Sequence, residues 1–351
     1  MTGVKAAVTF VVYRGTAPKN WDEIVCGLGG SIYHSTIWAE YQKKRKEGQP
    51  IFLLGFDNNG LPCAGALALL KMSPYLIVSR LSCSLVLSTH PFTRDYDRNL
   101  SVAFMRKCED YARSLGCIHM AIDSFLAGGS AYFPCDFGYR ETRRLEFCVD
   151  LYASKEELWR NISRDQRERI RRLSREGVAT EIGMERKDLK DLEVAREFTQ
   201  AKRSQQGMGY DLPTSGEFYD AIYEYLIKRG VARLFLAKRG REILGAILFA
   251  AFNGRASSIF SGSTEFGYKL GVQSGLFWAA VESFKKEGFL ELNRGGILES
   301  AANETDPLHG IYRFKQRLGT RPVVCRSGER ILSPLRYRLL GFGSRILRPY
   351  L

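Results

Sequence analysis

The chain has 351 residues, 45% of them hydrophobic and 26% charged, with 34 glycines and 11 prolines. This composition is that of a globular protein long enough for two hydrophobic cores, and it excludes disordered, collagen-like and coiled-coil chains. The 52 lysines and arginines exceed the 38 acidic residues and give a formal net charge of +14. That excess predicts a polyanionic partner, such as nucleic acid, a nucleotide-linked substrate or an anionic membrane face; the alternative is that it serves solubility alone.

The cysteines and histidines show no pattern of a metal site or a disulfide framework. The eight cysteines stand singly, without Cys-x-x-Cys, and the four histidines lack ligand spacing. Residues 1–14 lack the pattern of a secretory signal, and the most apolar stretch, Ile243 to Phe252, is far short of the roughly 20 residues that cross a bilayer. We therefore expect a cytoplasmic protein with no metal site and no transmembrane segment.

In chain order, two parts of the chain predict the same series of elements. The series is a hairpin, a helix, a strand, an aromatic segment and a last strand, first at residues 51–70, 100–115, 118–122, 132–139 and 145–151. The second copy follows about 180 residues later, at residues 233–249, 275–287, 289–293, 312–319 and 321–325. Each copy predicts an α+β domain with a mixed sheet flanked by helices. No Gly-x-Gly-x-x-Gly follows a strand and no P-loop occurs, so dinucleotide and P-loop chemistry have no support.

The predicted boundary between the two halves lies near Ala153. We expect an N-terminal domain at residues 1–153, a C-terminal domain at 154–330 and a basic amphipathic tail at 331–351. The tail interleaves arginines with Leu, Tyr and Phe, which fits contact with an anionic membrane face, at the inner side of the membrane, or docking onto the second domain.

The second domain begins with an arginine-rich segment. Ser154-Lys155-Glu156-Glu157 forms a capping box, and a helix is predicted from Leu158 to Gly177. Its apolar residues gather on one face, and five arginines gather on the opposite face: Arg160, Arg164, Arg167, Arg171 and Arg175. Such an arginine stripe suits the phosphates of a nucleic-acid backbone. The alternative is a solvated helix face, partly neutralised by nearby acidic residues.

Several segments together resemble a known family. They are the helix at residues 158–177, Lys202-Arg203 with Gly207, Phe218-Tyr219, the segment Phe260-Ser261-Gly262-Ser263, the helix around Trp278, Asn293-Arg294-Gly295-Gly296 and the run from Gly310 to Gly319. In this pattern the chain resembles the Fem-type aminoacyltransferases, over roughly residues 31–324. The run from Gly310 to Gly319, with its Phe-Lys pair, is the most specific part.

The resemblance implies a fold and an activity. The fold is two tandem acetyltransferase-like (GNAT) domains, here without the coiled-coil arm of some members. The activity is amide bond formation between an amino acid from aminoacyl-tRNA and an amine of a peptidoglycan precursor. Lys315 is expected to stabilise the oxyanion, since it lies near apolar residues where its charge acts in a lower dielectric. Phe314 packs to orient it or belongs to the core.

Substrate-binding residues follow from the same resemblance. Arg203 and Lys43 are expected to contact the diphosphate of a nucleotide-linked or lipid-linked precursor. Trp38 stacks on a base or sugar, or is a core residue, and Phe260 and Ser263 lie at the substrate site.

The chain departs from the family pattern at three places. Gln42 stands where the family has a Lys, with Lys43 beside it, and Phe260 replaces a Tyr. The segment from Lys269 to Gly275 only approximates an acetyl-CoA signature. The main alternative is nevertheless an N-acyltransferase that uses acyl-CoA on a sugar or exopolysaccharide precursor.

Two further hypotheses remain open at this stage. The arginine stripe alone would suit a catalytically inactive RNA-binding module. His309, six residues before Lys315, is a candidate proton relay. No cofactor is expected, because aminoacyl-tRNA or acyl-CoA would act as donor substrate.

Overall fold

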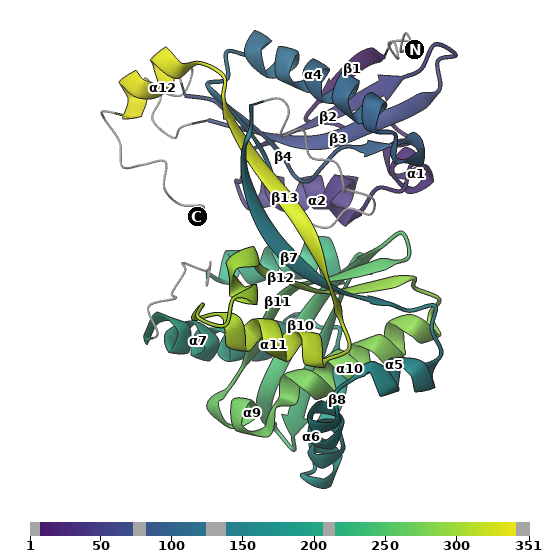
Figure 1. Cartoon of the computed structure of the whole chain (residues 1–351), viewed down its shortest axis with the longest axis vertical. Helices are drawn as coiled ribbons and strands as arrows, with labels where there is room; N and C mark the ends of the chain where they lie inside the picture. Colours follow the sequence, from purple (N-terminus) through teal and green to yellow (C-terminus); the bar gives the residue numbers. More distant parts are fainter. Residues whose placement is uncertain (1–7, 73–81, 124–137, 206–214, 342–351) are drawn as a thin grey trace. The chain divides into compact units, whose positions relative to one another are not determined.

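The computed structural model describes residues 8–72, 82–123, 138–205 and 215–341 (Figure 1). The chain divides into two compact units, which we name unit 1, residues 1–144 with 325–351, and unit 2, residues 145–324. The sequence predicts a boundary near Ala153 and a separate tail from residue 331. The structure instead divides the chain after Arg144 and returns it to unit 1 at Cys325.

Unit 1 contains a mixed sheet and two long helical segments. Its strands are β1 (Thr9–Arg14), β2 (Gln49–Phe56), β3 (Pro62–Lys71), β4 (Ser84–Leu87), β5 (Phe92–Thr93) and β6 (His119–Ile122). Its helices are α1 (Trp21–Gly27), the 3-10 turns η1 (Ile32–His34) and η2 (Arg94–Tyr96), α2 (Thr36–Lys44), α4 (Arg98–Ser114) and α12 (Pro334–Gly341). The order of the sheet is β1-β2-β3-β4-β6-β13, where β13 is Arg321–Ile331, and β4 and β6 are parallel.

Unit 2 repeats this arrangement with more helices. Its strands are β8 (Ala179–Gly183), β9 (Ala232–Arg239), β10 (Glu242–Phe252), β11 (Arg255–Ser263) and β12 (Glu291–Leu298). Its helices are α5 (Lys155–Asn161), α6 (Arg164–Arg175), η4 (Arg186–Asp188), α7 (Leu189–Gln205), α8 (Gly216–Ile222), the π-helical η5 (Tyr223–Ile227), α9 (Glu265–Leu270), α10 (Val272–Lys286), η6 (Glu299–Ala302) and α11 (His309–Arg317). The order of the sheet is β7-β12-β11-β10-β9-β8, and β11 and β12 are parallel.

The last strand of each sequence repeat is divided between the units. Strand β7 (Arg140–Asp150) passes into unit 2 at Leu145, and β13 (Arg321–Ile331) passes into unit 1 at Cys325. In unit 1, β13 pairs antiparallel with β6, with Gly328 opposite Ile122 and Ile331 opposite His119. Leu332 then lies in the core of unit 1, so the start of the expected tail packs there. Residues 342–351, with Arg345 and Arg348, are outside the described part of the chain.

The predicted α+β class is confirmed, because both units place a hairpin, a long helix and a parallel strand pair in the same order. The hairpins are β2–β3 and β9–β10, and the long helices are α4 and α10. Each helix lies against its own sheet (Figure 1): Phe104 of α4 joins the core of unit 1, and Phe277 and Phe284 of α10 join the core of unit 2. The aromatic segment at residues 132–137 lies outside the described residues.

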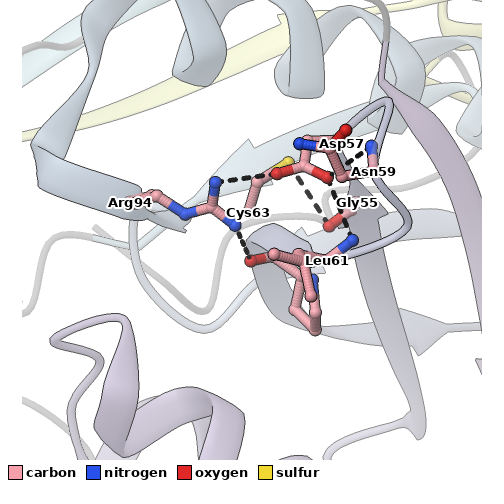
Figure 2. Close-up of polar contacts among 7 residues, drawn as sticks. Gly55, Asp57, Asn59, Leu61, Cys63 and Arg94 are labelled. Atoms are coloured by element: carbon pink, nitrogen blue, oxygen red, sulfur yellow. Dashed lines mark hydrogen bonds and ion pairs between the residues drawn. The ribbon is translucent and has the colours of Figure 1, made fainter.

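The first hairpin shows how local side chains fix such a turn (Figure 2). Asp57 Oδ1 accepts hydrogen bonds from the backbone amides of Asn59 and Leu61, at 2.9 and 3.0 Å. Arg94 donates to Asp57 Oδ2 at 2.8 Å and to the carbonyl of Pro62 at 2.7 Å. The hydrogen bond from Arg94, followed by those from the backbone, lowers the pKa of the Asp57 carboxyl. The turn of this predicted hairpin is therefore closed by its own aspartate.

Two buried histidines tie three segments of unit 1 together. His34 Nε2 lies 2.8 Å from the carbonyl of His90, and His90 Nε2 lies 2.6 Å from the carbonyl of Arg326 in β13. The backbone amide of Ser31 donates to His34 Nδ1 at 3.1 Å, which requires that nitrogen to be unprotonated. Burial lowers the pKa of both imidazoles to about 4. The two rings thus belong to the fold as neutral groups.

Helix α7 packs closely on β11 at a glycine. A Cβ at Gly262 would lie 2.4 Å from the carbonyl carbon and oxygen of Ala195, and 2.6 Å from the amide nitrogen of Arg196. Because these are backbone atoms, they cannot move aside as a side chain end can. Gly262 therefore sets the distance of α7, with Arg196 and Arg203, from the sheet.

We predict that Gly262→Ala destabilises the protein by roughly 1–3 kcal/mol, as overpacking against fixed backbone does. The urea midpoint of the purified full chain measures the change. Gly216→Ala is the control, because a Cβ at Gly216 meets no atom within 4 Å. Equal midpoints for the two variants would contradict the close contact of α7 with β11.

We predict that stability falls as the pH drops from 6.5 towards 4. In the unfolded chain both imidazoles regain a pKa near 6.5, so below that pH the unfolded state binds more protons than the folded state. Above pH 6.5 the two histidines leave the free energy of unfolding unchanged, and below that pH the free energy of unfolding falls progressively. Histidine proton NMR of the native protein checks the cause, and a titration midpoint near 6.5 for His34 or His90 would contradict it.

Candidate active site

Lys315 lies buried on α11 and is fixed by the backbone of β12. Only 8% of this residue is exposed. Its Nζ donates to the carbonyls of Gly295 and Gly296, at 2.6 and 3.1 Å, and lies 5.2 Å from the ring centroid of Phe147. An ammonium group has three N–H donors and no acceptor, so backbone oxygens and a ring face are suitable surroundings. The conformation of β12 thus sets the position of the charge.

The Asn-Arg-Gly-Gly motif gives β12 that conformation. Gly295 has φ of +85°, which favours glycine, and its amide donates to Asn293 Oδ1 at 2.8 Å. A Cβ at Gly295 would lie 3.9 Å from Lys315 Nζ. The motif therefore aims two carbonyl oxygens at Lys315.

Phe314, the neighbour of Lys315, packs against the core of unit 2. Leu318 is buried in the same core, and Thr320 Oγ1 donates to the carbonyl of Lys315 at 2.9 Å. These contacts hold α11 rather than the lysine side chain itself. Phe147, which the sequence did not single out, is the aromatic residue that faces the ammonium.

The parallel pairing of β11 with β12 stops beside this site. It covers residues 255–257 and 291–293, although β11 ends at Ser263 and β12 at Leu298. Arg294 is the first residue of β12 beyond the paired part. Its guanidinium is buried and donates to Gln273 Oε1 at 2.6 Å and to Ser258 Oγ at 3.4 Å.

Ser263 lies at the other end of the same network. Its Oγ accepts a hydrogen bond from Gln273 Nε2 at 3.0 Å, and its amide donates to Thr199 Oγ1 at 3.0 Å. Gln273 Nε2 also donates to the carbonyl of Gly262 at 2.7 Å. Ser263 is fully buried and links β11 to α7 and α10.

Phe260 takes part in an aromatic enclosure around a second buried arginine. The Arg196 guanidinium carbon lies 4.6, 5.1 and 5.6 Å from the ring centroids of Phe260, Phe218 and Tyr219. Arg196 also donates to the Tyr219 hydroxyl at 2.9 Å. The sequence analysis did not single out Arg196; the available signal is an arginine at helical spacing among the apolar residues of α7.

Arg203 lies seven residues after Arg196, in the last turn of α7, and is half-buried. Burial first, and the charge of Arg203 second, lower the pKa of Arg294 to about 10. The structure therefore brings Arg203 near Arg294, within the unit that contains Lys315. Gly207 lies outside the described residues.

Trp38 and Lys43 belong to unit 1, on α2. The Trp38 indole contacts Tyr33 edge-on at 5.0 Å and Tyr41 at 5.1 Å, and it is buried. Among the described residues neither its Nε1 nor the Oε1 of Gln42, one turn later, has a hydrogen-bond partner. Lys43 is exposed in the last turn of the helix.

The helix predicted from Leu158 to Gly177 is interrupted, which corrects the arginine stripe. Ile162 and Ser163 are extended, so α5 ends at Asn161 and α6 begins at Arg164. The Ser163 amide donates to the carbonyl of Arg317 at 2.9 Å, and a Cβ at Gly319 would lie 3.1 Å from the Asn161 carbonyl carbon. The C-terminal end of α11 thus lies against the residues that would otherwise continue α5 into α6 as one helix.

One member of the stripe has a structural contact. Arg167 Nη1 donates to the carbonyls of Ile162 at 2.6 Å and Arg160 at 2.8 Å, at the C-terminus of α5. Such carbonyls lack partners within their helix, so Arg167 caps α5. Arg171 and Arg175 both pair with Glu168, and all members of the stripe other than Arg167 are exposed.

His309 stands at the start of α11. Its Nδ1 lies 3.1 Å from the carbonyl of Ala301, and its ring stacks on Tyr312 at 5.8 Å. These contacts join α11 to η6.

The comparisons with known proteins agree on the fold. Residues 164–316 match the family described as the acetyltransferase (GNAT) domain. A crystal structure of FemX has a TM-score of 0.73 at 14% identity, covering 93% of this chain and 99% of that one. The chain has the tandem GNAT fold. The Fem-type resemblance is thereby confirmed for the fold, and the acyltransferase class is confirmed through the GNAT domain.

Two further solved structures are similar in fold. L-PGS from Bacillus licheniformis has a TM-score of 0.55 at 16% identity, covering 92% of this chain and 95% of that one. A tandem GNAT protein from the clavulanic acid biosynthesis pathway has a TM-score of 0.52 at 11% identity, covering 92% and 98%. No curated protein matches the chain in sequence.

The segment that approximates an acetyl-CoA signature in this GNAT domain is covered by α6. It forms the end of α9, a left-handed Gly271 and the first turn of α10. Ser274 Oγ donates to Gln166 Oε1 at 2.6 Å, and a Cβ at Gly275 would lie 2.5 Å from Leu173 Cδ1. Helix α6 therefore lies on the helix start that such a signature offers to a diphosphate.

In the described residues, no group of three or more His, Cys, Asp and Glu is arranged to hold a metal ion. Within the same residues, no helix has both the length and the apolar composition needed to cross a membrane.

Proposed function

We propose that the chain is an aminoacyltransferase that transfers an amino acid from aminoacyl-tRNA to an amine of a peptidoglycan precursor. One observation carries the proposal: the Fem-type motif on α11 holds a buried ammonium, Lys315, against the Gly295 and Gly296 carbonyls. The similarity of the fold to FemX supports it.

The reaction requires one new bond and the loss of another. The acceptor amine attacks the ester carbonyl of the aminoacyl-tRNA, a C–N bond forms, and the carbonyl oxygen becomes an oxyanion. When the oxyanion collapses, the ester C–O bond breaks, and the proton lost by the amine ends on the ribose oxygen. A fixed cation near the carbonyl oxygen stabilises the charged intermediate and the transition states on either side of it.

Lys315 suits this role because the Gly295 and Gly296 carbonyls that accept from its ammonium are neutral groups. A hydrogen bond from an ammonium to an oxyanion is stronger than one to a backbone carbonyl, and burial strengthens it further. An oxyanion formed beside Gly295 and Gly296 would therefore compete with these carbonyls for an N–H of Lys315. The carbonyls position the charge before the reaction begins.

The acceptor would carry a diphosphate, whether nucleotide-linked or lipid-linked. Arg203 is the phosphate ligand proposed in unit 2, where Phe260 and Ser263 are proposed substrate-binding residues, and Lys43 is a separate candidate phosphate ligand in unit 1. Trp38 is buried against Tyr33 and Tyr41, and its Nε1 has no hydrogen-bond partner among the described residues. We propose that its contact with the acceptor is made through Nε1.

The donor tRNA would bind the exposed arginines beside α6. Arg160, Arg164, Arg171 and Arg175 present guanidinium groups to solvent, and the net charge of +14 favours a polyanion. Arg336 and Arg338 of α12 are the described basic residues proposed to contact an anionic membrane face.

The acyl-CoA alternative has less support. Gln166 and Leu173 of α6 occupy the first turn of α10, where the approximate signature would have to receive a diphosphate. An inactive RNA-binding module is also disfavoured, because such a protein needs no buried lysine. Incubating the protein with charged tRNA, acyl-CoA and candidate precursors, and measuring which donor is consumed, decides among the three.

We predict that Lys315→Met lowers turnover by roughly 10² to 10³ with little change in KM for either substrate, since the oxyanion exists only after attack. Lys315→Arg should restore only part of the rate, because a planar fork cannot place one donor where an ammonium did. Steady-state kinetics measure both. Arg313→Met, which removes an exposed charge from the same helix, is the control. Near-normal turnover of Lys315→Met would remove the lysine from the mechanism.

We predict that replacing Arg164, Arg171 and Arg175 together by Gln weakens tRNA binding. The slope of the logarithm of the binding constant against the logarithm of the salt concentration should become less steep by about two to three, because each lost phosphate contact lowers it by about one. Filter binding from low to high salt measures this. Folding should persist, since Arg167 keeps its cap on α5. The control replaces three exposed lysines, Lys187, Lys190 and Lys228, by Gln. Equal losses in both triple variants would assign the effect to net charge alone.

A further inference from the structure

Arg294 is a buried cation that the proposed reaction does not use. It lies on β12 directly before the two glycines whose carbonyls hold Lys315, and only 6% of it is exposed. The guanidinium group has five N–H donors and stays charged at neutral pH, even with its pKa lowered to about 10. Bringing such a charge out of water costs several kcal/mol unless a partner offsets it.

The protein supplies Arg294 with neutral partners only, among the described residues. Nη2 donates to Gln273 Oε1 at 2.6 Å, and Nη1 makes a long bond to Ser258 Oγ at 3.4 Å. The Nε atom is buried and has no hydrogen-bond partner. An arginine with a purely structural role would be expected to have its buried donors paired. The Nε–H is therefore a buried donor that the described residues leave without an acceptor.

The guanidinium is held in place by its surroundings. Gln273 Nε2 donates to the Gly262 carbonyl at 2.7 Å and to Ser263 Oγ at 3.0 Å, so its Oε1 is fixed toward Arg294. The pairing of β11 with β12 ends at residues 257 and 293, so the backbone of Arg294 lies beyond the last residue that pairs with β11. A positioned, buried donor group is what a specific ligand site requires.

A second arginine acts on the first through its charge. The charge of Arg203 acts on Arg294 strongly enough to contribute to its lowered pKa, and no acidic residue contributes in the opposite direction. Two cations near each other in a partly buried place repel, and this repulsion is relieved when an anion binds between them. Arg203 is half-buried and offers the more accessible part of the pair.

We propose that Arg294 and Arg203 form a two-guanidinium subsite that binds an oxyanion group, a phosphate or a carboxylate. Arg203 contacts the group from its outer side, and the Nε–H of Arg294 contacts it from within. Guanidinium forks match both kinds of oxyanion. That the group belongs to the acceptor substrate rests on the proposed function, but the subsite itself does not. Arg294 would then link recognition of the acceptor to the strand that positions Lys315.

Binding of simple anions to the purified full chain tests the subsite without any reaction. Calorimetric titration with inorganic pyrophosphate and, separately, with acetate distinguishes a phosphate from a carboxylate preference. We expect one of the two to bind the wild type, and Arg294→Gln and Arg203→Gln each to weaken that binding at least tenfold. Arg241→Gln, which removes an exposed arginine from the β9–β10 turn, should bind as the wild type does.

Several outcomes would overturn the subsite. They are no binding of either anion to the wild type, equal affinity in Arg294→Gln, or an equal loss in Arg241→Gln. If Arg294→Gln does not fold, Arg294→Lys and Arg203→Gln decide the matter in the same way, since the lysine keeps the charge without the side-facing Nε–H.

A kinetic measurement connects the subsite to the acceptor. With an active enzyme, Arg294→Lys should raise the KM for the acceptor at least tenfold and change kcat less than threefold. If anion binding depends on Arg294 but the protein transfers no amino acid, the subsite is supported and the proposed function is rejected. If the protein transfers an amino acid but anion binding does not depend on Arg294, the subsite is rejected and the proposed function stands.

Discussion

The contact between the Lys315 ammonium and the carbonyls of Gly295 and Gly296 organises unit 2. It lies where β12 has left its pairing with β11 after Asn293, so that the two carbonyls are not part of that ladder. It also requires α11 to approach β12 closely, and Thr320 and Leu318 hold the helix there. One contact therefore depends on three features: the positive φ of Gly295, the end of the β11–β12 pairing and the anchoring of α11.

Three cations of unit 2 are buried against neutral groups. Arg196 is enclosed by aromatic rings, Arg294 contacts amide and hydroxyl groups, and Lys315 contacts two carbonyls. Each set of partners lessens the cost of removing a charge from water. The three charges favour the binding of anionic substrate groups and the formation of an oxyanion. Surface ion pairs, such as those of Glu168, contribute little to this attraction because solvent screens them.

The repeated hairpins and long helices could be predicted from the sequence, because their patterns are local and occur twice. The buried position of Lys315 could be inferred from the apolar residues around it. The break after Asn161 could not, since Leu158, Ile162 and Ile170 keep helical spacing across it and the cause lies at Arg317, far along the chain. Nor could the burial of Arg294, because an arginine followed by two glycines is typical of an exposed loop. The passage of β7 into unit 2 and of β13 into unit 1 could not be predicted either. The spacing of residues shows that a strand exists, but it does not show which sheet the strand joins.

The return of the chain to unit 1 has a consequence for synthesis. When the ribosome has made residues 1–144, strand β6 lies beside β4 but still lacks its other neighbour, because Gly328 to Ile331 are translated only after unit 2. The nascent first unit must therefore wait with an open sheet edge while all of unit 2 is made. A chaperone or the ribosome surface would have to shield that edge during elongation. A nonsense codon anywhere before residue 325 would damage both units, including the one encoded first.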